Sequence, residues 1–101
     1  MGKSVVRRGD PDVPHCSGMS RAGASSNVFV NGIGVSRRND PNNSHQFPPP
    51  VGNPPKCLFH VGSISVGSTR VFANGLGVGR TGDSLAGCTA CGSGSTNVFA
   101  G

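Results

Sequence analysis

Residues 28–40 read VFVNGIGVSRRND and residues 71–83 read VFANGLGVGRTGD, and the two stretches are identical at eight of thirteen positions. In each, a short run of strand-forming residues precedes Asn-Gly, and a second short run ends in a turn that contains Arg and Asp. Because Asn and Gly both tolerate the positive φ that a two-residue type I′ turn requires, each stretch predicts a tight β-hairpin. Two such matches in a chain of 101 residues indicate an internal duplication.

A third copy of the same phrase is divided between the two ends of the chain. Residues 97–101 read NVFAG and match the first strand of the hairpin, whereas residues 5–10 read VVRRGD and match the second strand and its turn. We therefore expect the two termini to meet and to form the third hairpin. Three equivalent hairpins would close around a pseudo-threefold axis, which also removes exposed sheet edges. The sequence predicts an all-β fold in one domain over residues 1–101.

The segments between the hairpins show little hydrophobic periodicity, and none of them predicts a helix. The longest spans residues 41–69 and contains FPPPVGNPP at residues 47–55. Such a stretch is stiff and resembles polyproline II. A surface linker and an SH3-type ligand are the alternatives, but its position between two matched hairpins favours a rigid structural excursion.

The composition predicts a small hydrophobic core. The chain has 17 Gly and 8 Pro, and it has no Trp and no Tyr. A chain with few large apolar side chains buries little apolar area, so a further source of stability is expected, such as a disulfide, a metal or a partner. The chain has four Cys and no apolar signal segment. We expect a protein made in the cytoplasm without a signal peptide, whose Cys residues are metal ligands or thiols.

The net charge of +5 does not by itself indicate nucleic-acid binding. The basic residues are scattered along the chain, with Arg-Arg pairs at residues 7–8 and 37–38 and no longer run. Aromatic residues do not alternate with them, as they do in proteins that stack single-stranded bases. We therefore expect no nucleic-acid partner. No stretch approaches the roughly 18 apolar residues of a membrane-spanning helix.

Metal ligands recur at one offset from the Asp that ends each copy. After four intervening residues, the three copies present His15, His45 and Cys88. If the copies surround one axis, these side chains converge and supply most of a tetrahedral zinc site. His60, in the middle segment, could complete a set of three His and one Cys. Four protein ligands make a closed, structural site, which in small zinc modules contributes on the order of 10 kcal/mol to folding.

A zinc ribbon is the alternative metal site. Cys57 and His60 form one spaced pair, and Cys88 and Cys91 form another. Such pairs hold zinc in nucleic-acid or protein binding modules. The gap of 27 residues between the pairs is longer than usual, and a ribbon gives no role to the other two His.

The residues do not predict an enzyme. A catalytic nucleophile needs a base that a third group holds in place, and all three His are better explained as metal ligands. The chain has no Glu, and three of its four Asp recur as turn residues of the copies. The Gly-x-Gly sequences belong to hairpins and are not followed by a helix, so they do not predict a phosphate loop.

The repeated frame resembles PAAR-repeat proteins. The resemblance is carried by NVFVNGIGVSRRND (27–40), RVFANGLGVGRTGD (70–83), VVRRGD (5–10) and STNVFAG (95–101), and it covers essentially the whole chain. Of the family's Pro-Ala-Ala-Arg motif, which follows the Asn-Gly turn, this chain retains only the Arg. The resemblance therefore rests on the surrounding Val-Phe, Asn-Gly, Arg and Asp frame.

The resemblance implies a small cone of β-hairpins, with a metal near its vertex, that sharpens a trimeric β-helical spike. Such spikes belong to contractile phage tails and to type VI secretion systems. Family members hold one zinc, or in some cases iron, through three His and one Cys. On this chain the implied ligands are His15, His45, His60 and Cys88, with Cys91 as the alternative to Cys88.

The resemblance also implies a partner and a location. One monomer would cap one three-chain spike, with one hairpin on each spike subunit, and would contact the target membrane transiently as the machine pierces it. The residues expected in the core and at the base against the spike are Val28, Phe29, Val71, Phe72, Val98 and Phe99. No toxin domain accompanies the frame, so we expect a bare tip; this favours a phage tail over a secretion system.

Overall fold

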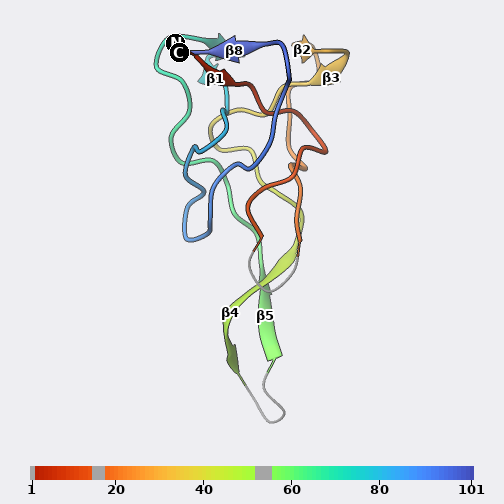
Figure 1. Cartoon of the computed structure of the whole chain (residues 1–101), viewed down its shortest axis with the longest axis vertical. Coiled ribbons are helices and arrows are strands. Elements are labelled where there is room, and N and C mark those ends of the chain that lie inside the picture. The colour runs from red at the N-terminus through yellow and green to blue at the C-terminus, as the bar shows by residue number, and fades with distance from the viewer. Residues whose placement is uncertain (1, 15–17, 52–55) are drawn as a thin grey trace.

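The structure is a computed structural model that describes residues 2–14, 18–51 and 56–101, except for the side chains of residues 47–51 and 56–58. Over these residues the chain forms strands and turns and no helix, which confirms the all-β prediction (Figure 1). The strands pair into four antiparallel two-stranded sheets. They are β1 (Lys3–Ser4), β2 (Phe29–Val30), β3 (Ile33–Gly34), β4 (His45–Val51), β5 (Lys56–His60), β6 (Phe72–Ala73), β7 (Leu76–Gly77) and β8 (Phe99–Ala100).

The two intact copies fold into the hairpins that their sequences predict. Strand β2 pairs with β3, and β6 pairs with β7. Asn31 and Gly32 have φ of 56° and 76°, and Asn74 and Gly75 have φ of 54° and 78°. Positive φ at both turn residues is the requirement of a type I′ turn, so the Asn-Gly interpretation is confirmed.

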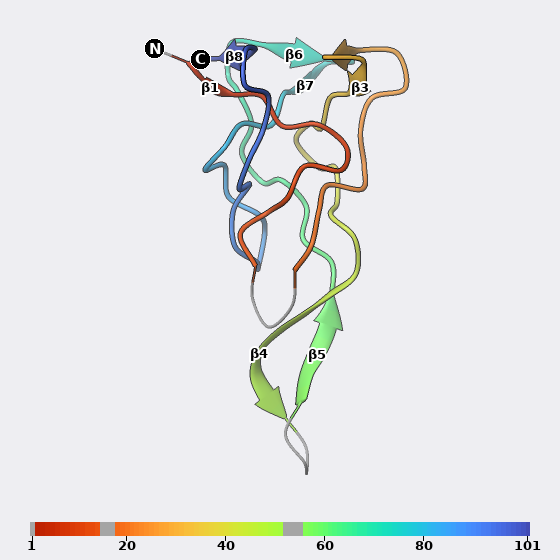
Figure 2. The ribbon, with the colours of Figure 1, turned by 45° about the vertical axis from the view of Figure 1, so that its right-hand side comes forward.

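The two ends of the chain meet, as predicted. Strand β1 pairs with β8, and Lys3 lies opposite Ala100. The carbonyl of Gly101 also accepts a hydrogen bond of 2.6 Å from Ser68 Oγ. Figures 1 and 2 show both termini at the wide end of the molecule, beside the two intact hairpins.

Backbone bridges link the three copies into a ring. Each bridge joins the Val of one copy to an Arg of another copy. The bridges are Val5–Arg80, Val35–Arg7 and Val78–Arg37. The three Val side chains are buried together with Ala73 and Ala100, and they form the first hydrophobic cluster. The pairing order is cyclic, whereas the pseudo-threefold axis and the cone stay predictions.

An Arg-x-x-Asp turn closes each copy. The Asp carboxylate accepts hydrogen bonds of 2.8–3.1 Å from the backbone N–H and from the guanidinium of the Arg three residues earlier. These pairs are Arg7–Asp10, Arg37–Asp40 and Arg80–Asp83. The hydrogen bond to Asp raises the pKa of each Arg. The three Asp are therefore structural turn residues.

A buried Ser begins each copy, and the sequence analysis missed its role. In Ser25, Ser68 and Ser95, Oγ accepts hydrogen bonds from the backbone N–H groups two and three residues later. Two of these hydroxyls also bond, at 2.6 Å, to the Asn side chain of another copy's turn: Ser25 to Asn74 and Ser95 to Asn31. Each Ser thus shapes its own strand entry, and all three also reach across the ring, because Ser68 Oγ bonds at 2.6 Å to the carbonyl of Gly101 in the third copy.

Strands β4 and β5 form a fourth hairpin that the sequence did not predict. The segment expected to be a rigid structural excursion contains this two-stranded ribbon, with a register shift between Phe47 and Val51. It projects from the narrow end of the molecule, opposite the termini (Figures 1 and 2). Proline lacks the N–H of a ladder bond and is confined to edge strands and bulges, so the Pro run argued against a strand here. In a two-stranded sheet, however, both strands are edge strands, and β4 can therefore contain proline. The molecule measures 46 × 25 × 23 Å.

Removal of one Ser hydroxyl tests the role of the buried Ser that begins each copy. We expect Ser25→Ala to lower the free energy of unfolding by about 1–3 kcal/mol, because it leaves buried hydrogen-bonding groups without a partner. In a chain of this size each kcal/mol shifts Tm by about 4–8 °C. Ser26→Ala, at the exposed neighbouring residue, is the matched control. Equal Tm values for the two variants, measured by calorimetry, would contradict this role.

Candidate functional site

Three potential metal ligands converge at the narrow end of the body, by which we mean the molecule without the projecting hairpin β4–β5. The Nε2 atoms of His45 and His60 lie 3.2 Å and 3.5 Å from Cys88 Sγ. All three potential ligand atoms lie within 4.8 Å of one another. Neighbouring ligands of a tetrahedral zinc are about 3.4–3.7 Å apart, given bond lengths of about 2.0–2.3 Å. The cluster could therefore hold a metal ion, and its donor set suits zinc.

The hairpin β4–β5 positions the two His. His45 is the first residue of β4, His60 is the last residue of β5, and they lie directly opposite each other. Cross-strand neighbours have Cβ atoms about 4.5–5.5 Å apart. Their rings are accordingly close, with centroids 4.5 Å apart at an angle of 66°. Cys88 comes from the segment between β7 and β8, so the cluster joins both strands of the hairpin to the body.

A contact between the His45 ring and a backbone carbonyl sets the tautomer of His45 that metal binding requires. His45 is buried, and its Nδ1 lies 2.9 Å from the carbonyl oxygen of Asn43. A carbonyl only accepts, so Nδ1 must carry the proton and donate it. This leaves the lone pair on Nε2, the atom that faces Cys88. Metal-ligating His residues are commonly oriented by such a bond from the other ring nitrogen.

A close backbone approach at Gly62 makes room for the cysteine. A Cβ at Gly62 would lie 2.8 Å from Cys88 Cβ and 3.0 Å from its Sγ. The N–H of Gly62 donates to Asn42 Oδ1 at 2.7 Å, and Asn42 Nδ2 donates to Asp12 Oδ2 at 3.0 Å. Since both Asn42 and Asp12 are buried, these bonds fix the backbone that follows β5 against the body.

A buried ion pair supports the same region. Arg21 and Asp12 are almost fully buried, and Arg21 Nη1 lies 3.5 Å from Asp12 Oδ2. Arg21 Nη2 donates to the carbonyl of Asp40 at 2.9 Å. Burial raises the pKa of the Asp12 carboxyl, and the neighbouring Arg21 opposes this shift. Both residues of the pair lie in the segment between the split copy and the first intact copy, and Arg21 Nη2 also lies 3.5 Å from the carbonyl oxygen of Gly62, beside the ligand cluster.

The alternative ligand Cys91 lies outside the cluster of three. Its buried Sγ is 3.9 Å from Arg21 Nη1, and its side chain packs with Val6, Ile64 and Leu85 in the second hydrophobic cluster. Burial raises the pKa of the Cys91 thiol to about 11. The Cys57 side chain, which the zinc ribbon would need, lies outside the described residues.

The structure brings together three of the four ligands expected from the sequence. The equal offset from the Asp predicted that His45 and Cys88 would occupy equivalent places, and their ligand atoms lie 3.2 Å apart. His60 joins them as the cross-strand partner of His45, a relation that required the unpredicted hairpin. His15 lies outside the described residues.

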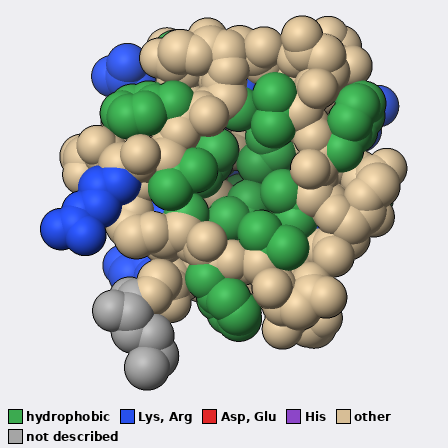
Figure 3. All heavy atoms as spheres, turned by 90° about the horizontal axis from the view of Figure 1, so that it is seen from above, with side chains coloured by type: hydrophobic (Ala, Val, Ile, Leu, Met, Phe, Trp, Pro, Cys, Tyr) green, Lys and Arg blue, Asp and Glu red, His purple; other side chains and the backbone are tan. Residues whose placement is uncertain are grey.

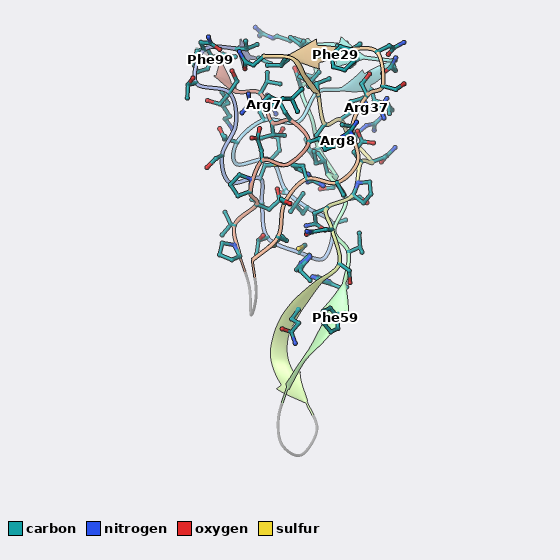
Figure 4. The ribbon with its side chains drawn as sticks, turned by 90° about the vertical axis from the view of Figure 1, so that its right-hand side faces the viewer. Arg7, Arg8, Phe29, Arg37, Phe59 and Phe99 are labelled. Atoms are coloured by element: carbon teal, nitrogen blue, oxygen red, sulfur yellow. The ribbon has the colours of Figure 1, made fainter. Side chains whose placement is uncertain are left out.

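The wide end presents a second candidate site, an apolar face formed by all three copies, which we call the wide face. Phe29, Phe72 and Phe99 occupy the same place in the frame and are 57 %, 57 % and 56 % exposed. Figure 3 shows hydrophobic side chains gathered on this face, and Figure 4 shows Phe29 and Phe99 at this end of the molecule. Among the other residues expected at the base, Val28 and Val98 pack partly buried against the first cluster, whereas Val71 is exposed.

Comparison with known proteins found no matching protein family and no matching curated protein. The resemblance to PAAR-repeat proteins therefore rests on the residues of the chain itself. The described part of the chain has no helix with the length and apolarity that a membrane span requires.

Metal content tests the ligand set. We expect purified protein to contain bound metal, and His45→Ala or Cys88→Ala to remove it, because each variant deletes a converging ligand. Cys91→Ala is the control and should keep the metal, since Cys91 faces Arg21 and the second cluster. Elemental analysis of the three variants measures this. Metal that is lost from Cys91→Ala but kept by the other two would contradict the assignment.

Metal binding should also stiffen the projecting hairpin. A metal held by His45, His60 and Cys88 ties the base of both strands to the body. We expect zinc, added to metal-free protein, to slow amide hydrogen exchange in β4 and β5 by about ten-fold or more near the base. Cys88→Ser keeps both His and serves as the control, in which zinc should have a smaller effect. An unchanged exchange rate in wild-type protein would contradict the expectation that a metal ties β4 and β5 to the rest of the molecule.

Proposed function

We propose that this protein is the tip of the central spike of a contractile injection machine. In this proposal the wide face caps the end of a trimeric β-helical spike protein, and the narrow end leads when the machine strikes a target membrane. One chain caps one spike trimer, and the chain is a monomer on its own. The machine is a contractile phage tail or a type VI secretion system. The protein is made in the bacterial cytoplasm and assembles at the tip of the spike.

The observation that carries the proposal is the equal exposure of Phe29, Phe72 and Phe99. Contiguous apolar patches on a soluble surface commonly mark interaction sites. Here the patch is assembled from one Phe in each of the three copies, and the copies are linked in a ring. A surface with three like contacts suits a partner with three like chains. The chain therefore offers one hydrophobic contact to each subunit of a trimer.

The metal would have a mechanical role in this proposal. His45, His60 and Cys88 would hold a structural zinc, or alternatively iron, together with His15 as the fourth ligand. When bound, the metal supplies cross-links between segments that are far apart in the sequence. With four protein ligands the site has no open position for water or substrate, so we propose stabilisation of the narrow end and no catalysis.

Binding to a spike trimer tests the proposal. The probe is the β-helical end of the trimeric spike protein from the same source, and native mass spectrometry should show one copy of this chain per trimer. Phe72→Ala should weaken the complex about ten-fold or more, because burying a Phe side chain contributes about 1.5–3 kcal/mol.

Phe59→Ala provides the matched control for this experiment. Phe59 is 69 % exposed, but it lies on β5 in the projecting hairpin, far from the wide face (Figure 4). Its replacement should leave the affinity for the trimer unchanged. The proposal is wrong if wild-type protein does not bind the trimer, or if Phe59→Ala weakens binding while Phe72→Ala does not.

A further inference from the structure

Every carboxylate side chain of this protein is already paired within the chain. The chain has four Asp and no Glu. Three Asp are bound by the Arg of their own turn, and Asp12 is bound by Arg21. The net charge of +5 is therefore carried by the other basic residues. They are Lys3, Arg8, Arg38, Lys56 and Arg70.

Four of these five cations lie around the apolar face. Lys3 is in β1, Arg8 and Arg38 donate backbone hydrogen bonds to β3 and β7, and Arg70 lies beside the end of β8. All four are exposed. In Figure 3 the Lys and Arg side chains stand at the edge of this face, around the central hydrophobic group. The face is thus an apolar centre with a basic rim.

A pocket joins one rim cation to the apolar centre. It has a volume of about 360 Å³, and Arg38, Val66 and Phe72 are among its lining residues. Val66 is 55 % exposed, so the apolar lining is open to solvent. This combination suits an apolar side chain of the partner that has a carboxylate close by. The pocket would therefore add a shape-complementary contact to the electrostatic attraction of the basic rim.

We propose that the wide face binds a protein end on which an apolar centre is surrounded by carboxylates. This inference rests on the proposed function, since it describes the chemistry of the same partner: the end of the spike should carry Asp or Glu around its apolar centre. Individual exposed ion pairs contribute only about 0.2–1 kcal/mol. Several like charges on one face act together, and they raise the association rate and fix the orientation of docking.

The polar groups within the face favour a protein over a membrane or a nucleic acid. The exposed side chains of Asn31, Asn74 and Asn97 accompany the three Phe, and they are already engaged in hydrogen bonds across the ring. A bilayer interior cannot replace the water that these amides lose, whereas a protein surface can. Nucleic-acid binding draws on many phosphate contacts, whereas these cations are few and are separated around the rim.

Neutralising one rim cation tests the inference. The probe is again the trimeric β-helical end of the spike protein from the same source, and the association rate is measured at low and high salt. We expect Arg38→Gln to slow association several-fold at low salt and to reduce its salt dependence, whereas Arg38→Lys keeps both. Lys56→Gln removes the same charge from β5 in the projecting hairpin and should leave the rate unchanged. Equal thermal stability of the variants excludes misfolding.

The outcomes separate this inference from the proposed function. If the trimer binds with the same rate at both salt concentrations and in Arg38→Gln, the proposed function stands. The inference that the partner carries carboxylates around its apolar centre is then wrong. If wild-type protein does not bind the trimer at either salt concentration, both are wrong. Binding to vesicles of phosphatidylcholine and phosphatidylserine, or to a DNA duplex, in place of the trimer would overturn the protein assignment of this face.

Discussion

The backbone bridge between a Val of one copy and an Arg of another is the interaction on which the rest of the structure depends. Val5, Val35 and Val78 each make such a bridge, and together they link the copies in a ring. The same Val residues form the centre of the first hydrophobic cluster. Each bridging Arg is also held by its own Asp, so one short segment supplies backbone pairing, apolar burial and a charged hydrogen bond.

The ring places the two candidate sites at opposite ends of the molecule. In each intact copy, Phe precedes the bridging Val, and the potential metal ligand follows it at a fixed distance along the chain. Phe29 and Phe72 therefore reach the wide face, whereas His45 and Cys88 reach the narrow end. If the proposed function holds, the metal stabilises the end that strikes the target, and the apolar face transmits force from the spike. A small core would be sufficient for this, because the ring, the turns and a bound metal would share the stabilisation.

Local sequence chemistry was enough to predict the hairpins and part of the metal centre. The Asn-Gly turns depend only on φ preferences, and equal offsets in repeated copies led to His45 and Cys88. Features that arise from contacts between distant segments were not predictable in this way. The Pro run concealed β4, which left His60 without a structural reason to join the cluster. Nothing in the neighbouring sequence identified Arg21 as the buried partner of Asp12.

Amide hydrogen exchange of the two terminal segments, measured by NMR, tests ring closure most directly. The N–H of Ser95 donates to the carbonyl of Val5 at 2.8 Å, and the N–H of Ser25 donates to the carbonyl of Val35 at the same distance. If the chain ends complete the third copy, Ser95 should be protected to within about ten-fold of Ser25. Rapid exchange at Ser95 together with slow exchange at Ser25 would show that the third copy is open, and it would contradict the ring.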